Sequence, residues 1–255
     1  MKIDPSILCR VPRGEHERFE RYAAHIVCES FIFTGDRDYL TARFAFFQRQ
    51  SHLFLWSAAQ ALEKYLKANI LLLGGGVIKR IHEHTKLADE LRQVHPKRLE
   101  IDLTIPLGWA EQGVANWPKR DIQAYLQSIE IFGAPNVRYD QVQLEVHLQD
   151  LVFLDRLAFS LRHQLVADEV DSCKLVGDQL TRRFFDLNYS FAPDDHQHPD
   201  LIGISLLHSS VTTLEAAVKG CFGHETAYQE WASKSMGLNA KDLQRLAHRP
   251  NAYND

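Results

Sequence analysis

The sequence predicts an all-α protein, an up-and-down antiparallel helical bundle with additional helices at its N- and C-terminal ends. Two observations support this fold class. Apolar residues recur at intervals of three and four over most of the chain, which is the spacing of one helix face. Glycine and proline separate these patterns, whereas long stretches such as residues 141–166 contain neither. Both residues disfavour helix interiors, so their positions indicate where helices end.

The first helical pattern covers residues 15–27. Its apolar positions are Phe19, Tyr22, Ala23, Ile26 and Val27. After Gly35, a second pattern covers residues 38–50, with Tyr39, Ala42, Phe46 and Phe47. A third pattern covers residues 52–73 and ends at three glycines, 74–76, which suit a helix C-cap and a loop. We expect the second and third helices to form an antiparallel pair.

The helix over residues 52–73 has the clearest pattern. Its apolar face comprises Leu62, Tyr65, Leu66, Asn69, Ile70 and Leu73. Glu63 and Lys67 are four residues apart, in the order that favours an ion pair on a helix surface. The three glycines that follow do not form a phosphate-binding loop, because no strand precedes them and no Gly-Lys-Ser/Thr follows.

Shorter elements follow towards the C-terminus. We expect a helix over residues 85–94 that stops before Pro96, and an extended segment over 99–107, where apolar residues alternate. A helix with Pro118 in its first turn should end at Gly133. Further helices are expected at 141–166, 171–187, 201–221, 225–236 and 239–247, the last with Asn239 as its cap.

Composition excludes several classes of protein. The net charge of -4 argues against a general nucleic-acid coat protein, so any RNA contact needs a local basic patch. The four cysteines form no CxxC pair, which argues against a zinc knuckle and is typical of reduced thiols. The N-terminus lacks a signal-peptide pattern, and no run of about 18 apolar residues is present. We therefore expect a soluble cytoplasmic protein that does not enter the membrane.

Four segments occur in an order and spacing that resemble the HEPN family. They are DYLTAR at 38–43, AQALEKYLK at 59–67, HTKL at 84–87, and Arg138 with Tyr139. The resemblance covers residues 33–166, preceded by an N-terminal helical extension at 1–32 and followed by a helical region at 167–255, docked or separate. It implies an up-and-down bundle that is often a homodimer. Many bacterial members are encoded beside nucleotidyltransferase antitoxins or in defence loci.

The resemblance also directs attention to one arginine and one histidine. Ribonuclease-type members carry an Arg and a His separated by four to six residues, and a dimer brings two such pairs together. Arg156 and His163 fit this spacing and lie about 20° apart on one helix face. A His could move protons at a ribose hydroxyl while a guanidinium stabilises charge on phosphorus, without a metal. Leu157, however, stands where the family motif prefers a polar residue.

Both catalytic candidates also have a simpler interpretation, as solvated or interface side chains. Val152 and Phe159 fall on the same side of the helix, and a dimer or the C-terminal region could cover that face. The candidate ligand-binding residues are Lys64, Lys67, Arg138 and Tyr139. The last two could instead have a structural role, with Arg138 bridging to carboxylates or carbonyls.

A polar loop at residues 194–200 contains the best candidate metal cluster. His196, His198 and Asp200 alternate along it, and such residues can converge on a cation. No fourth ligand is visible, and loops of this composition are ordinary solvent-exposed connections, so we predict no metal and no cofactor. Two functions remain. The favoured one is a dimeric regulatory module that binds a nucleotide, RNA or a partner protein, and the alternative is a metal-independent endoribonuclease toxin using Arg156 and His163.

Overall fold

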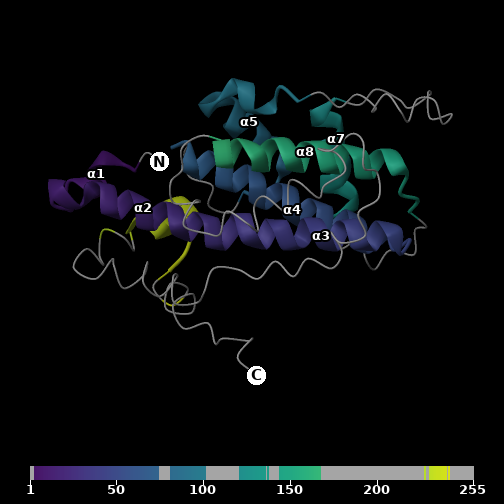
Figure 1. Ribbon diagram of the computed structural model, residues 1–255, viewed down its shortest axis with the longest axis horizontal. Helices are drawn as coiled ribbons and strands as arrows, with labels where there is room; N and C mark the ends of the chain where they lie inside the picture. The colour runs from purple at the N-terminus through teal and green to yellow at the C-terminus, as the bar shows by residue number, and fades with distance from the viewer. Residues whose placement is uncertain are drawn as a thin grey trace.

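The computed structural model describes residues 3–74, 81–101, 121–135, 137, 144–167, 227, 230–239 and 241. Every regular element within these ranges is helical and none is a strand, which confirms the predicted all-α class. Helix α3 (Phe33–Phe47) runs antiparallel to both α4 (Ser51–Leu72) and α8 (Leu148–Ala167), which lie beside it (Figure 1). Among the described helices, none combines the length and apolar character needed to cross a membrane.

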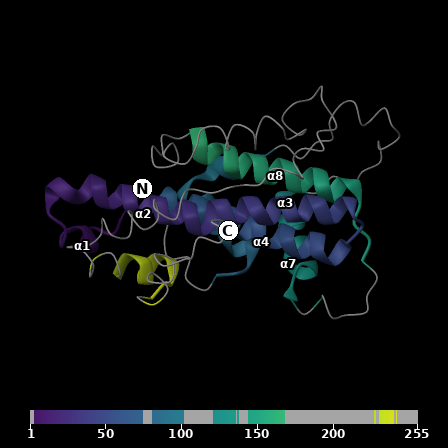
Figure 2. The ribbon, with the colours of Figure 1, turned by 60° about the horizontal axis from the view of Figure 1, so that its bottom comes forward.

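Residues 16–47 form one long helical rod. After the short helix α1 (Pro5–Leu8) and a 3-10 turn, η1 (Arg13–Glu15), helix α2 (His16–Val27) continues through a π-helical turn, η2 (Cys28–Ile32), directly into α3 (Figure 2). The predicted break at Gly35 is therefore wrong. A Cβ atom at Gly35 would lie 3.1 Å from Cε1 of Tyr65, so the glycine allows α3 to approach α4 closely.

Helix α4 lies at the centre of the bundle. It contacts α3, α8, α5 (His84–Val94) and α7 (Ile122–Phe132). Fifteen of its 22 residues are buried. All of the predicted apolar face except the terminal Leu73 is completely buried, and alanines at 58, 59, 61 and 68 let neighbouring helices pack closely. The sequence pattern thus located the helix around which the others assemble.

Helix α7 joins α4 at a close backbone contact. Its N-cap is Asp121, whose side chain accepts a hydrogen bond from the Ala124 amide at 2.6 Å. The helix begins at Ile122, so the expectation that Pro118 lies in its first turn is wrong. Gly133 ends the helix, and a Cβ there would lie 2.7 Å from both the Ala59 Cβ and the Leu55 carbonyl oxygen. A side chain at this position is therefore incompatible with the observed packing.

Other boundaries depart from expectation. Residues 96–99 form a 3-10 turn, η3 (Pro96–Leu99), where an extended segment was expected to begin, and residues 102–107 lie outside the described part. The last bundle helix starts at Leu148 rather than at residue 141. In the C-terminal region, η6 (Ala232–Met236) lies within the helix expected at 225–236. The helices expected at 171–187 and 201–221 fall in undescribed residues, and the proposed division at residues 32 and 166 stays a prediction.

Candidate functional site

Two buried ion pairs join α3 to α8. In the first, Nε of Arg162 lies 3.1 Å from Oδ1 of Asp36, and neither side chain is more than 4% exposed. In the second, Arg43 pairs with Asp155, which is fully buried. Each helix provides one acid and one base seven residues later in the chain, so the acid of each helix meets the base of the other. This reciprocal arrangement is possible only when α3 and α8 are antiparallel in this register.

Two tyrosine hydroxyl groups complete this core ion-pair cluster. Tyr65 donates a hydrogen bond to Oδ1 of Asp36 at 2.6 Å, and Tyr39 donates to Asp155. Burial, reinforced by the negative charge of Asp36, raises the pKa of Tyr65 well above its ordinary value. The phenol therefore remains a donor. Each buried carboxylate accepts hydrogen bonds from an arginine and a tyrosine, as a buried charge requires.

The geometry of the cluster indicates a structural role and not a catalytic one. A general acid or base must reach a proton on the substrate. The two carboxylates are almost completely shielded from solvent, and their acceptor positions are occupied by guanidinium and phenol donors. These groups therefore hold α3, α4 and α8 together and do not present themselves to a substrate.

The predicted catalytic pair lies on the same helix. Arg156 follows Asp155 directly and is half-buried, while the side chain of His163 lies outside the described residues. Because α8 is continuous through both positions, their backbones are two turns apart on one helix face. Val152, which was expected to form part of an interface, is already buried within a single chain.

The two candidate ligand-binding lysines are engaged in ion pairs. Lys64 pairs with Asp38, and burial raises the pKa of Asp38 despite the opposing effect of that lysine. Nζ of Lys67 lies 2.6 Å from Oε1 of Glu63, which confirms the predicted pairing, although the lysine side chain is only 9% exposed rather than on the surface. Arg138 and Tyr139 lie outside the described residues.

His84, the first residue of the HTKL segment, ties α5 to α4. Its Nε2 atom lies 2.7 Å from the carbonyl oxygen of Ala59. Burial lowers the pKa of His84, and the contact with Ala59 only partly opposes that effect. The ring is therefore held neutral, with Nε2 as the donor. Within the part of the chain that the structure describes, Nδ1 has no hydrogen-bond partner.

No group of three or more His, Cys, Asp or Glu side chains suited to a metal occurs among the described residues. The loop candidates His196, His198 and Asp200 lie outside them. The structure therefore leaves that loop as a sequence hypothesis.

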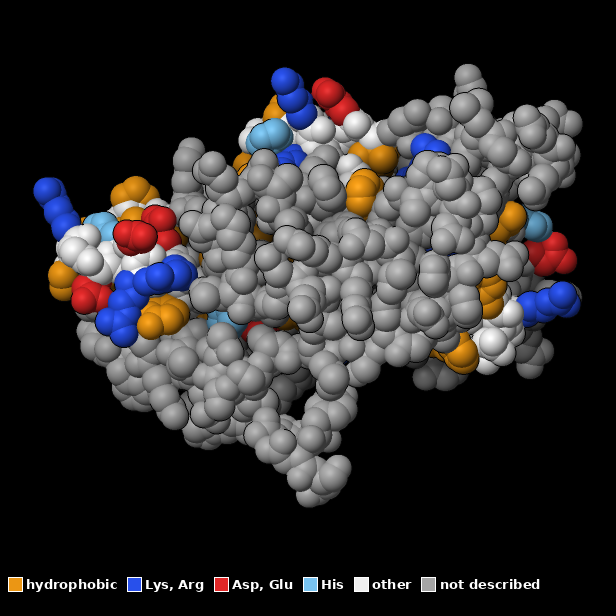
Figure 3. Space-filling view, viewed as in Figure 1, with side chains coloured by type: hydrophobic (Ala, Val, Ile, Leu, Met, Phe, Trp, Pro, Cys, Tyr) orange, Lys and Arg blue, Asp and Glu red, His pale blue; other side chains and the backbone are white. Residues whose placement is uncertain are grey.

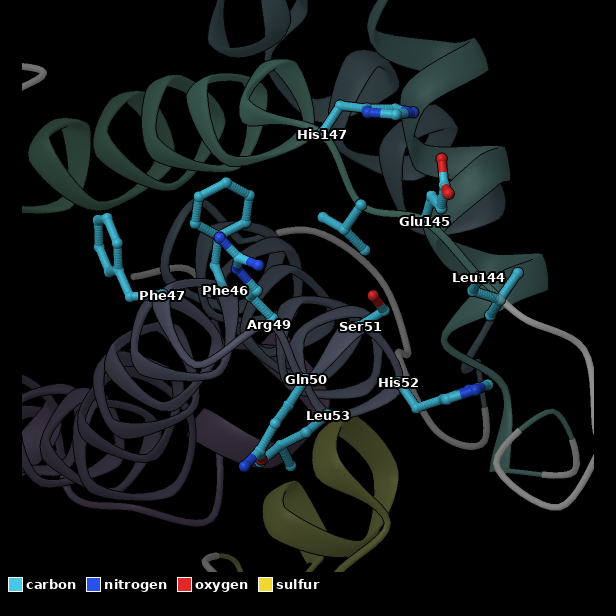
Figure 4. Close-up of a pocket in the computed structure, with 11 residues that line it drawn as sticks. Phe46, Phe47, Arg49, Gln50, Ser51, His52, Leu53, Leu144, Glu145 and His147 are labelled. Atoms are coloured by element: carbon cyan, nitrogen blue, oxygen red, sulfur yellow. The ribbon is translucent and has the colours of Figure 1, made fainter.

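A pocket of about 1090 Å³ lies at one end of the bundle, and we call it the end pocket. One side is formed by Phe46, Phe47 and residues 49–53 around the α3–α4 turn, and the other by residues 144–147 ahead of α8 (Figure 4). The end of the molecule to which α3 runs carries hydrophobic, basic, acidic and histidine side chains together (Figure 3). The pocket thus combines apolar and ionisable groups.

The aromatic wall of the end pocket is held in place by contacts with Phe46 and Arg43. The rings of Phe46 and Phe47 meet edge to face, with centroids 5.5 Å apart. The guanidinium carbon of Arg43 lies 5.9 Å from the centroid of Phe47. Because Arg43 is paired with Asp155, the ring of Phe47 rests on a fixed cation, yet the residue is 52% exposed.

Arg49 occupies an unusual position at the edge of the pocket. Its φ of 57° lies in the left-handed region, which other residues avoid and glycine prefers. The amide of Arg49 donates to the Phe46 carbonyl and that of Gln50 to the Ala45 carbonyl, which is the Schellman pattern at a helix C-terminus. The exposed side chain forms no ion pair with any described residue.

The sequence patterns missed both of these features. Asp36, Arg43, Asp155 and Arg162 were not singled out as partners, although charged residues at positions continuing an apolar face are a signal for buried pairing. The end pocket was missed because its two walls are about 90 residues apart in the chain. Periodicity locates a helix face but does not say which distant face it meets.

Comparison with known proteins adds no relative to this geometry. No family model matches the chain, and no curated protein or solved structure matches it significantly.

Proposed function

We propose that this protein is a helical-bundle binding module of the HEPN kind. It acts as a cytoplasmic homodimer that recognises a nucleotide, RNA or a partner protein without cleaving it. The order and spacing of the four segments within residues 33–166 support kinship with that family, as does the antiparallel pairing of α3 and α4, which carry two of them. Kinship also supports a toxin-antitoxin or defence context with a nucleotidyltransferase-type partner.

The observation that carries a binding role is the internal pairing of the charged groups on the bundle helices. Asp36 and Asp155 are buried and hydrogen-bonded to arginine and tyrosine, and Lys64 and Lys67 are paired with carboxylates. Acid–base catalysis needs a group that can exchange a proton with its substrate. These pairs favour structural rigidity and recognition over chemistry.

The continuity of helix α8 supports a second candidate function, that of a ribonuclease. The helix is unbroken over Leu148–Ala167, so the backbones of Arg156 and His163 lie two turns apart on one face, and Arg156 is half-buried. That spacing suits a metal-independent endoribonuclease, in which His163 transfers protons and Arg156 stabilises charge on phosphorus across a dimer. Leu157 in place of a polar residue weighs against it.

One experiment separates the two functions. The full chain is incubated in EDTA with a mixture of single-stranded RNA and tRNA, and cleavage and binding are both measured. Arg156→Ala and His163→Ala are compared with Arg21→Ala, which removes an exposed arginine on α2. A binding module retains RNA without cutting it, and light scattering gives a dimer at micromolar concentration.

Two results would contradict the proposed non-catalytic dimer. Cuts that disappear in Arg156→Ala and in His163→Ala, but persist in Arg21→Ala, would establish the ribonuclease and reject the non-catalytic module. A monomer at micromolar concentration would reject the dimer.

A further inference from the structure

We propose that the end pocket binds a nucleoside 5′-monophosphate, either as a free nucleotide or as the phosphorylated 5′ end of an RNA strand. The choice of ligand class rests on the proposed binding function, and the location rests on the pocket itself. Its volume of about 1090 Å³ is ample for one nucleotide.

Phe47 provides the surface for the base. A half-exposed phenylalanine ring offers a π face to a planar partner, and nucleobases stack on such rings without sequence preference. Phe46 meets this ring edge to face, and the guanidinium of Arg43, fixed by Asp155, lies over it. The ring is thus ordered before a ligand arrives, which reduces the entropy lost on binding.

Arg49 provides the charge for the phosphate. It projects at the pocket edge and forms no ion pair with a described residue, and guanidinium groups bind phosphate oxygens through paired hydrogen bonds. His147 lies across the pocket from it, and Nδ1 of His52 is buried without a hydrogen-bond partner among the described residues (Figure 4). Three nitrogen-bearing side chains therefore line one pocket.

The backbone conformation of Arg49 also supports a binding role for its side chain. The Schellman position favours glycine, so a side chain there adds strain. Retaining arginine at a strained position is explained if the guanidinium acts on a ligand. Stability and binding should then respond in opposite directions when Arg49 is replaced by glycine.

Glu145 favours a ligand that has ribose hydroxyl groups and few phosphate groups. Its exposed carboxylate lines the same pocket, where it can accept hydrogen bonds from ribose hydroxyl groups. The same charge repels additional phosphates. A monophosphate should therefore bind more tightly than a triphosphate.

The test is calorimetric titration of the full chain with AMP, ATP, adenosine and inorganic phosphate. Two short RNAs of one sequence, with a 5′-phosphate or a 5′-hydroxyl end, complete the set. We expect AMP to bind more tightly than the other three small molecules. Arg49→Gly and Phe47→Ala should each weaken binding by about tenfold or more, whereas Arg21→Ala should not. The thermal midpoint of Arg49→Gly should equal or exceed that of the wild type.

The outcomes are distinguishable. Tight binding of only the 5′-phosphorylated RNA identifies the strand end as the ligand, and binding of AMP alone identifies the free nucleotide. Binding of either that survives both pocket substitutions would overturn this site while leaving the binding function intact. Absence of binding to every probe by folded wild-type protein would overturn the site and remove nucleotides and RNA from the proposed function.

Discussion

Gly133 shows how one residue can fix the distance between two helices. It ends α7 against α4, where an added Cβ would lie 2.6 Å from the Ile129 carbonyl oxygen and 2.7 Å from both the Leu55 carbonyl oxygen and the Ala59 Cβ. Two of these three atoms belong to the backbone, which cannot move aside as a flexible side chain can. The missing side chain is therefore part of the packing.

Replacement of Gly133 by alanine should lower the free energy of unfolding by about 1–3 kcal/mol, because α7 must move away from α4. Urea denaturation followed by circular dichroism measures the change. Gly14→Ala is the matched control, since no heavy atom lies within 4 Å of the added Cβ, and it should change stability by less than about 0.5 kcal/mol. Equal effects of the two substitutions would contradict this account of the α4–α7 contact.

At the scale of elements, the core ion-pair cluster determines how α8 lies against α3. Buried ion pairs contribute little net stability relative to apolar residues, because both charges lose their hydration. The acid of α3 meets the base of α8, and seven residues later the base of α3 meets the acid of α8. A shifted or parallel alignment of the two helices would break both pairs, so this placement disfavours it. We infer that the cluster selects the register more than it adds stability.

Removal of one partner should therefore be costly. Asp36→Ala and Arg162→Ala should each lower the free energy of unfolding by about 3–5 kcal/mol, because each leaves an unpaired buried charge. The double substitution should cost less than the sum, with a coupling energy above about 1 kcal/mol in a double-mutant cycle.

The exposed pair Glu83–Lys86 serves as the comparison, since both side chains are more than half exposed. Substitution of either residue by alanine should change stability by about 0.5 kcal/mol or less. Strict additivity at Asp36 and Arg162 would show that the two side chains do not act as a unit.

At the scale of the whole molecule, two buried histidines link stability to pH. Burial lowers the pKa of both His25 and His84 below the ordinary value near 6.5. In the unfolded chain both rings take up a proton as the pH falls past that value, whereas the folded protein resists protonation. The unfolded state thus binds more protons in this window, so stability must fall as the pH falls.

The free energy of unfolding should accordingly decrease between pH 7.5 and 5.5, by at most about 1.4 kcal/mol per pH unit for each histidine. Urea midpoints measured across this range report the slope. The double variant His25→Gln/His84→Gln should flatten it, even though its stability at pH 7.5 is lower. A slope that persists unchanged in the double variant would assign the pH dependence to other groups.

Much of the fold followed from local pattern. The start of α2 at His16 and both ends of the helices at Ser51–Leu72 and His84–Val94 were expected within one or two residues, because apolar periodicity and helix-ending residues act over short distances. The Glu63–Lys67 pair was expected for the same reason. Gly35 misled the prediction, since its low helix propensity was outweighed by the close contact that it permits with Tyr65.

The helical class, the central helix and most helix boundaries could be predicted from the amino-acid sequence, since these depend on residues within a few turns of one another. The three-dimensional arrangement was needed to find that Asp36 meets Arg162, that Arg43 meets Asp155, and that residues 46–53 face residues 144–147 across a pocket. Such contacts depend on the register between distant helices. That register is selected by packing and buried pairing together, and no local pattern encodes it.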